Sequence, residues 1–148
     1  MQRLVLFLSA ICLSVCLSAQ STADTTYSQL RQSADSLTSA IDSDKILTTN
    51  LFTGNLMWGD FRANCFYKVG TYAIPKMEIF FADSSAGKKV LYFDKDNGLV
   101  KIIHKGLTYY YTGTKLIDAK GKPVKPYIAN DIVFFSQEVN KLLLNLLE

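Results

Sequence analysis

The middle of the chain is a series of short strand-like segments separated by turns, and this pattern constrains the fold more than any other feature. The segments are rich in β-branched and aromatic residues, and a glycine lies in each connection between them. We place strands at residues 76–82, 88–94, 99–104, 107–112 and 115–118. Connections this short join neighbouring antiparallel strands, so the sequence predicts an antiparallel meander.

Two further segments are weaker candidates for strands. Residues 61–69 can add a strand before the meander, and residues 124–128 follow a turn that ends at Pro123. Residues 48–59 show no clear strand pattern, and the glycines and asparagine within them favour a loop. We therefore expect five or six strands.

Amphipathic segments flank the meander. In residues 24–41 apolar side chains recur at steps of three and four, which predicts a helix capped by Asp24 or a neighbouring threonine. Near the other end, Asn130 or Asp131 can cap a second helix with an apolar stripe over residues 132–147. The predicted fold class is α+β, a five- or six-stranded antiparallel meander with an N-terminal and a C-terminal amphipathic helix packed on the sheet.

The turns predict which side chains share a face of the sheet, because residues opposite each other point to the same side. Two-residue loops at Asn97-Gly98 and Lys105-Gly106, and a turn at Gly113-Thr114, fix the register. One face then carries the predicted core, which is Leu91, Phe93, Val100, Ile102, Leu107, Tyr109, Tyr111 and Leu116. The other face carries a candidate binding surface, which is Tyr92, Asp94, Lys101, Ile103 and Tyr110, with Asp94 opposite Lys101.

Residues 1–19 have the layout of a cleavable secretory signal. Arg3 supplies a positive charge, an apolar stretch continues to Leu17, and small residues follow. The apolar stretch is shorter than the roughly twenty residues that cross a membrane. We expect cleavage after Ala19 or Ala23, with residues 20–148 forming one globular domain that has no transmembrane helix.

Cysteine usage and charge indicate the compartment and the class of partner. Cys65 is the single cysteine beyond the leader, so an internal disulfide is excluded, and such a secreted domain fits a bacterial periplasm or secretion from a bacterium. A lipid anchor on Cys16 is not expected, because Val15 stands where the lipoprotein signal needs a small residue. The net charge of +3 is too small to indicate a nucleic-acid partner.

Few residues are available for catalysis or metal binding. Cys65 and His104 are the only thiol and imidazole beyond the leader, and they form the one candidate nucleophile and base pair. Cys65 lies in a strand-like segment, which favours a structural thiol. One histidine and one cysteine are too few for the usual zinc sites, and residues 94–98 have the spacing of a hairpin turn and not of a calcium loop. We expect no metal and no cofactor.

One segment resembles a group of known proteins. Residues 89–124 include Val90-Leu91-Tyr92-Phe93, Asn97-Gly98-Leu99-Val100, Tyr109-Tyr110-Tyr111 and Asp118-Ala119-Lys120-Gly121-Lys122. With these turn motifs the segment resembles the hairpin-rich middle of small uncharacterised secreted or periplasmic bacterial proteins. The resemblance implies an antiparallel sheet and supplies no known active site. The end of the leader, Leu17-Ser18-Ala19-Gln20, is similar to leaders common in Gram-negative envelopes.

Three functions are compatible with these features. The first is a secreted or periplasmic, non-enzymatic binding module whose partner is a protein, a peptide or a glycan. The second is a small thiol-dependent enzyme that uses Cys65 and His104. The third is a structural subunit of a cell-surface assembly, in which the apolar C-terminal segment pairs between chains. The sequence leaves the partner and the oligomeric state open.

Overall fold

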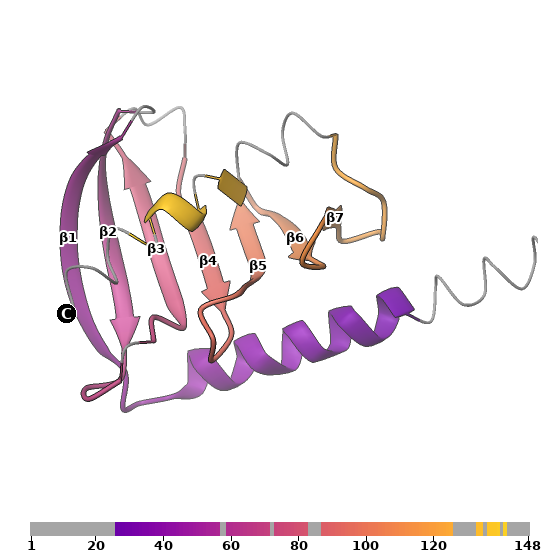
Figure 1. Ribbon diagram of the computed structural model, residues 1–148, viewed down its shortest axis with the longest axis horizontal. Helices are drawn as coiled ribbons and strands as arrows, with labels where there is room; N and C mark the ends of the chain where they lie inside the picture. Colours follow the sequence, from indigo (N-terminus) through magenta and orange to yellow (C-terminus); the bar gives the residue numbers. More distant parts are fainter. Residues whose placement is uncertain are drawn as a thin grey trace, which may run out of the picture.

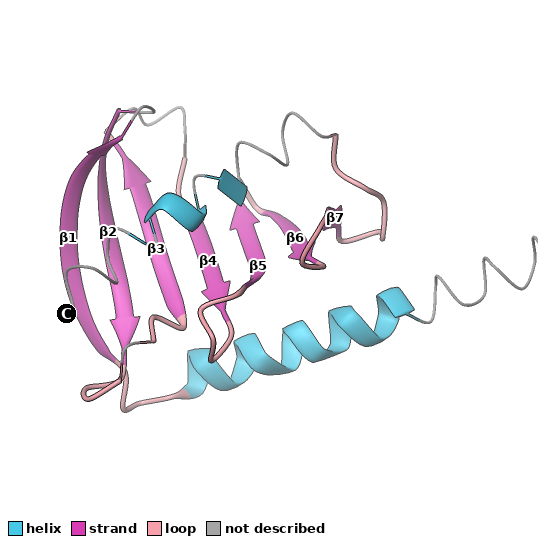
Figure 2. Cartoon of the chain, viewed as in Figure 1, coloured by secondary structure: helices cyan, strands magenta, loops and turns pink. Residues whose placement is uncertain are grey.

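The computed structural model describes residues 26–56, 59–71, 73–82, 87–125, 133–134, 136–139 and 141. It has an α+β fold with one long helix over residues 26–43 and a seven-stranded sheet (Figures 1 and 2). The strands are β1 (Thr48–Leu56), β2 (Gly59–Tyr67), β3 (Lys76–Phe81), β4 (Lys89–Phe93), β5 (Leu99–His104), β6 (Leu107–Tyr111) and β7 (Leu116–Asp118). Every strand pairs antiparallel with its neighbour in the sequence, so the predicted meander is confirmed.

The sheet has seven strands where we expected five or six, and the expected loop over residues 48–59 was wrong. The first part of that segment is β1, which pairs with β2 from Thr48 opposite Tyr67 to Leu56 opposite Gly59. Gly54 is a close-approach glycine inside the strand, because a Cβ there would lie 2.8 Å from the ring of Phe61. The sequence shows that residue 54 is glycine, but it does not show whether that glycine packs closely against a neighbouring strand or forms a turn. The strand was missed for this reason.

The predicted N-terminal helix is confirmed, and it lies across the strands on one face of the sheet (Figure 1). The structure has a single long helix, the N-terminal one, where two were predicted; of the predicted second helix it describes residues 133–134, 136–139 and 141, which are helical. The rest of that predicted helix, and the predicted strand at 124–128 after Lys125, lie outside the described residues. No helix in the described ranges is long and apolar enough to cross a membrane.

The hydrophobic core lies on the face of the sheet opposite the long helix. Met77, Leu91 and Ile102 are fully buried there, and they alternate along their strands with residues that contact the helix. Val139, from the C-terminal pieces, is also 0% exposed and belongs to this core. The two faces are therefore covered by opposite ends of the chain.

The predicted pairing of β4 with β5 was wrong by two residues. Lys101 lies opposite Tyr92 and not Asp94, because the connection has five residues and is not a two-residue loop at Asn97-Gly98. The Asp94 carboxylate organises this longer turn by accepting hydrogen bonds from the amides of Asp96 (2.9 Å) and Gly98 (2.7 Å). A shift of two residues preserves the faces, since side chains alternate with a period of two.

A bulge next to this turn changes one core residue. The register shifts between Tyr92 and Phe93, so Leu99, which is 8% exposed, lies opposite Phe93 and takes the core position expected for Val100. Leu107 is 59% exposed and also leaves the predicted core, since it stands at the end of its strand directly after a turn. The other predicted core residues, Leu91, Phe93, Ile102, Tyr109, Tyr111 and Leu116, are buried or packed against the core.

The remaining two turns have the predicted register. Ile102 lies opposite Tyr109, and Tyr111 lies opposite Leu116. Lys105 has a φ of 51° and Gly106 a φ of 75°, the left-handed conformations that a two-residue hairpin loop of this kind requires.

Candidate binding site at the end of the helix

Aromatic and lysine side chains alternate across five neighbouring strands on the face that the long helix covers. We call this set the aromatic–lysine row, and its members are Phe66, Lys76, Tyr92, Lys101 and Tyr110. The Lys76 ammonium lies 5.0 Å from the ring centroid of Phe66 and 5.6 Å from that of Tyr92. Lys101 lies 6.0 Å from the Tyr92 centroid and 5.7 Å from that of Tyr110. Each lysine is therefore held between two aromatic rings.

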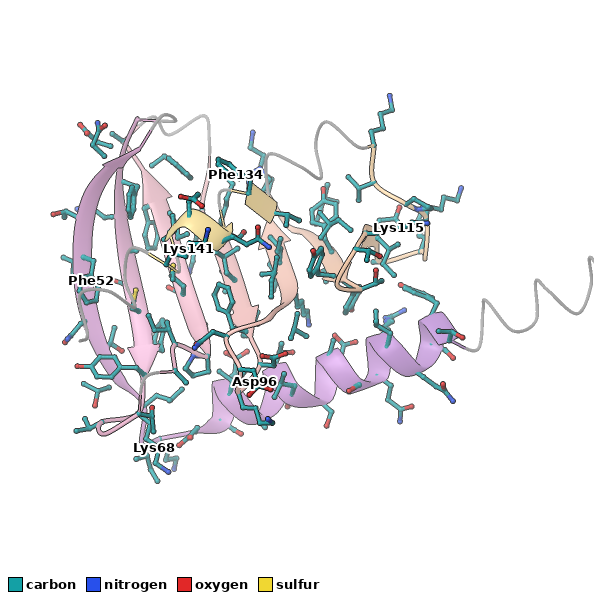
Figure 3. All side chains as sticks on the ribbon, viewed as in Figure 1. Phe52, Lys68, Asp96, Lys115, Phe134 and Lys141 are labelled. Atoms are coloured by element: carbon teal, nitrogen blue, oxygen red, sulfur yellow. The ribbon has the colours of Figure 1, made fainter. Side chains whose placement is uncertain are left out.

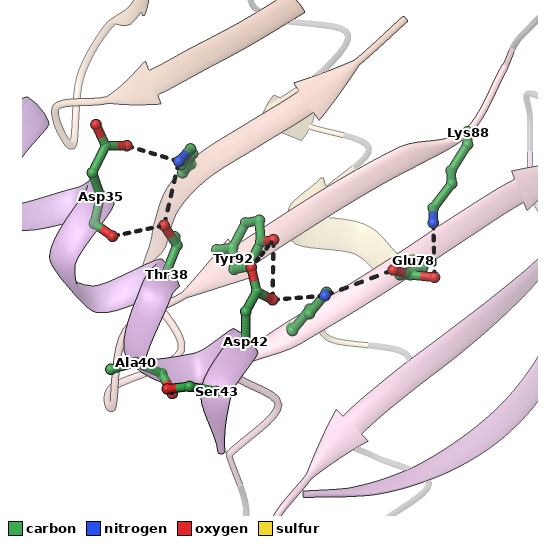
Figure 4. A network of polar contacts seen from close by, with 10 residues as sticks. Asp35, Thr38, Ala40, Asp42, Ser43, Glu78, Lys88 and Tyr92 are labelled. Atoms are coloured by element: carbon green, nitrogen blue, oxygen red, sulfur yellow. Dashed lines mark hydrogen bonds and ion pairs between the residues drawn. The ribbon is translucent and has the colours of Figure 1, made fainter. Parts of the chain in front are cut away.

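Two helix carboxylates bind the two lysines of the row. Asp35 accepts hydrogen bonds from Lys101 (2.7 Å) and from the Tyr110 hydroxyl (2.9 Å). Asp42 accepts them from Lys76 (2.7 Å) and from the Tyr92 hydroxyl (3.0 Å), as Figure 4 shows.

The spacing of these carboxylates explains the direction of the helix. The two lysines are two strands apart, which is about 9.6 Å, and seven residues of helix rise about 10.5 Å. A helix that satisfies both lysines must therefore lie across the strands.

These contacts change the acidity of the groups involved. Burial alone would raise the pKa of Asp35, but hydrogen bonds from Lys101 and Tyr110 and the attraction of Lys101 and Arg31 outweigh it, so the pKa lies below its ordinary value. Burial is the largest cause that raises the pKa of the Tyr92 hydroxyl, and the hydrogen bond to Asp42 raises it further. Burial and the hydrogen bond to Asp35 do the same for Tyr110. The Asp35 carboxylate is thus charged and the two tyrosines are neutral at neutral pH.

The structure brings together three of the five residues of the candidate binding surface. Tyr92 and Tyr110 are 4% and 3% exposed, and with Lys101 they lie beneath the helix. Ile103 lies on the same face further along β5 and is half-buried, whereas Asp94 lies in the turn at the end of β4. The helix itself therefore occupies much of this face.

Sequence reasoning missed the acidic partners in the helix. Asp35 and Asp42 are seven residues apart and adjoin apolar residues of the buried stripe, Ala34 and Ile41. Carboxylates on the inward side of an amphipathic helix indicate a charged partner in the sheet, and that signal was present in the sequence.

A groove of about 610 Å³ opens where the helix ends, and we call it the helix-end groove. The helix and its connection to β1, the loop between β2 and β3, and the turn between β4 and β5 form its walls. The lining residues are Leu37, Ala40, Ile41, Asp44, Leu47, Lys68, Thr71, Ala73, Pro75, Phe93, Asp94, Lys95 and Asn97. Most of the inner lining is apolar and the charged residues stand at the rim, where Lys68 projects near this end of the helix (Figure 3).

Hydrogen bonds hold the walls of the groove together. The Ile74 amide donates to the side-chain oxygen of Asn97 (3.3 Å), and the Phe93 amide donates to the carbonyl of Pro75 (2.9 Å). These bonds join the β2–β3 loop to the β4–β5 turn and to the last residue of β4. The Asp44 carboxylate accepts from the Ile46 amide (2.9 Å) and shapes the chain just after the helix. The groove is therefore built into the fold before any ligand arrives.

The structure does not bring Cys65 and His104 together. Cys65 is in β2 and His104 in β5, three strands apart, which separates them by about 14 Å across the sheet. Cys65 is 1% exposed, and burial raises the pKa of its thiol to about 12. Burial, followed by the charge of Lys89, lowers the pKa of His104 in spite of a hydrogen bond with the Lys88 backbone. A buried, protonated thiol beyond reach of the imidazole lacks the geometry of a nucleophile and base pair.

Within the described ranges, no three His, Cys, Asp or Glu side chains gather in a way that could hold a metal ion. Comparison with protein-family models, with curated proteins and with solved structures finds no match to the chain. What the site can bind therefore follows from its own residues.

Proposed function

We propose that the chain is a secreted or periplasmic, non-enzymatic binding module that takes up a segment of a protein or peptide in the helix-end groove. The observation that carries the proposal is the groove itself, which is formed by three separate connections, two of which are joined by hydrogen bonds. Its volume of about 610 Å³ is of the size that ligand sites have in proteins. The pattern of residues 1–19 supports export to the compartment where such a module would work.

The chemistry of the lining favours a peptide over a glycan. Leu37, Ile41 and Pro75 offer aliphatic surface, which suits an apolar side chain. Phe93 is the aromatic residue of the lining, but it is 1% exposed and cannot stack against a sugar ring. Lys68 and Asp94 at the rim can orient the polar backbone and charged neighbours of such a side chain.

A phage-displayed library of random peptides, panned against the processed protein, tests the proposal. Ala40 lines the groove from the exposed side of the helix, so Ala40→Trp should fill it without disturbing the core. Ser39 is the neighbouring exposed position and is not among the lining residues, so Ser39→Trp is the matched control.

We expect enriched peptides with an apolar anchor that bind Ala40→Trp at least about tenfold more weakly than the parent, a loss of about 1.4 kcal/mol. Ser39→Trp should bind them as the parent does. Enrichment no greater than on an unrelated protein, or equal binding to Ala40→Trp, would contradict the proposal.

A further inference from the structure

The two edge strands of the sheet, β7 and β1, differ in how well they are protected against pairing with a further strand. On the outer side of β7 the chain returns and closes the edge, because Ile117 bridges to Pro123 and the Val124 amide donates to the carbonyl of Leu116 (2.9 Å). β7 is only three residues long, and proline cannot extend a sheet. These are features with which natural proteins block further strand pairing.

β1, at the opposite edge, has none of these features. It is nine residues long, it pairs with β2 without a register shift, and its sequence TTNLFTGNL contains no charged residue and no proline. No strand pairs with its outer side in the part of the chain that the structure describes. Every second residue of an edge strand points its amide and carbonyl away from the sheet, so β1 presents a row of hydrogen-bonding groups. Leu51, in the middle of the strand, is 63% exposed.

We propose that β1 pairs antiparallel with β1 of a second copy of the chain, so that one continuous sheet runs through both copies. A strand can satisfy an open edge with regular backbone hydrogen bonds, and two identical strands do so around a two-fold axis. This inference concerns assembly and stands independently of the groove.

The side chains of β1 favour a second copy as the occupant. With the two-fold axis at Leu51, that side chain lies opposite Leu51 of the partner subunit, and Thr49 lies opposite Thr53 of the partner subunit. These residues share one face, because their numbers differ by two. Threonine pairs and apolar pairs stabilise antiparallel strands, and the absence of charge means that identical edges do not repel. On the other face Phe52, which packs against the hydrophobic core, lies opposite Asn50 of the partner subunit.

One strand from each copy buries a small interface, so we expect association in the micromolar range and a dimer in equilibrium with monomer. Each dimer presents two helix-end grooves, and a partner with two binding segments would gain from avidity.

Sedimentation velocity over micromolar to millimolar concentrations, with the processed chain purified from the periplasm of an expression host, tests the inference. Leu51→Lys places like charges opposite each other at the axis, whereas Leu107→Lys changes a similarly exposed leucine (59%) far from β1. The parent and Leu107→Lys should dimerise, and Leu51→Lys should dimerise at least about tenfold more weakly. A monomer at every concentration, including one that binds extended peptides along β1, or equal dimerisation of Leu51→Lys, would overturn the inference.

A cysteine at the axis tests the register even if Leu51→Lys folds poorly. In a Cys65→Ala background, Leu51→Cys should form a disulfide-linked dimer in oxidised glutathione, because residues opposite each other have Cβ atoms about 5 Å apart. Leu107→Cys, treated in the same way, should stay monomeric. Equal cross-linking of the two variants would contradict pairing through β1. Ala40→Trp should leave dimerisation unchanged, so failure of this inference is separable from failure of the groove.

Discussion

Burial determines how reactive the one thiol in the sheet, that of Cys65, can be. Cys65 lies opposite Met77 on the core side of the sheet, and neither side chain reaches solvent. A thiol whose pKa is raised to about 12 is almost entirely protonated at pH 7, and the thiolate is the reactive form. Cys65 therefore contributes through packing.

Replacing Cys65 with alanine should cost about 1 kcal/mol of folding free energy, because it removes one buried sulfur and leaves a small cavity. Peptide binding should not change. Urea denaturation gives the first quantity. Reaction of the native thiol with an aromatic disulfide reagent, compared with the unfolded chain, should be slower by at least about a hundredfold. Rapid reaction of the native protein, or lost binding in a variant of normal stability, would favour the thiol-enzyme hypothesis.

The helix is attached to the sheet largely through polar contacts. Ala34 and Thr38 are its buried residues, and the larger apolar side chains Leu30, Leu37 and Ile41 are only half-buried. The ion pairs from Asp35 and Asp42 to the aromatic–lysine row therefore set where the helix lies, and with it the wall of the helix-end groove.

Acid should loosen this attachment. The pKa of Asp35 is lower in the folded chain than in the unfolded chain, so its contribution is present above the unfolded value, about 4, and is lost as the pH falls through the folded value. Asp35→Asn should destabilise the protein by about 1 kcal/mol at pH 7, since the carboxylate is partly exposed, and the difference from the parent should vanish in acid.

Urea denaturation at a series of pH values measures this difference, and hydrogen exchange should show faster opening of residues 30–43 in Asp35→Asn. Asp96→Asn, which removes an exposed carboxylate in the β4–β5 turn, is the control and should change neither quantity. A difference from the parent that is independent of pH would contradict this account of how the helix is held.

The elements that sequence predicted well are those with local signals. Hairpins at Lys105-Gly106 and Gly113-Thr114 and the N-terminal helix follow from short-range patterns, and all three are confirmed. The β4–β5 register was missed because the side chain of Asp94 favours a longer turn over the two-residue loop that Asn97-Gly98 indicates.

The features that the sequence did not predict depend on contacts between residues that are far apart in the chain. Gly54 is a glycine because of Phe61, a residue on the neighbouring strand, and no local pattern reveals that contact. The helix-end groove combines residues from three distant connections, so sequence identified only Asp94 among its lining. The sequence correctly placed Tyr92, Lys101 and Tyr110 together on one face. The position of the helix that covers them was not predicted, because it depends on the match between helical rise and strand spacing.

At the scale of the whole molecule, the chain uses its two ends to cover the two faces of one sheet. The C-terminal pieces complete the core, and the N-terminal helix covers the aromatic–lysine row and ends at the groove. In the described part of the chain no strand pairs with the outer side of β1, and no residue of β1 lines the groove, which meets that strand only at the preceding Leu47. The proposed pairing through β1 would therefore leave the groove lining free. This arrangement is the one that the proposed binding module would use, with its groove formed by loops on a scaffold of strands.

The central claim is that the chain binds through the helix-end groove, and a ¹H–¹⁵N NMR titration with a peptide enriched by panning tests it most directly. The account predicts amide shift changes concentrated at residues 37–47, 68–71, 73–75 and 93–97, which form the walls of the groove. Changes concentrated along β1, around Cys65 or His104, or spread evenly over the sheet would contradict it.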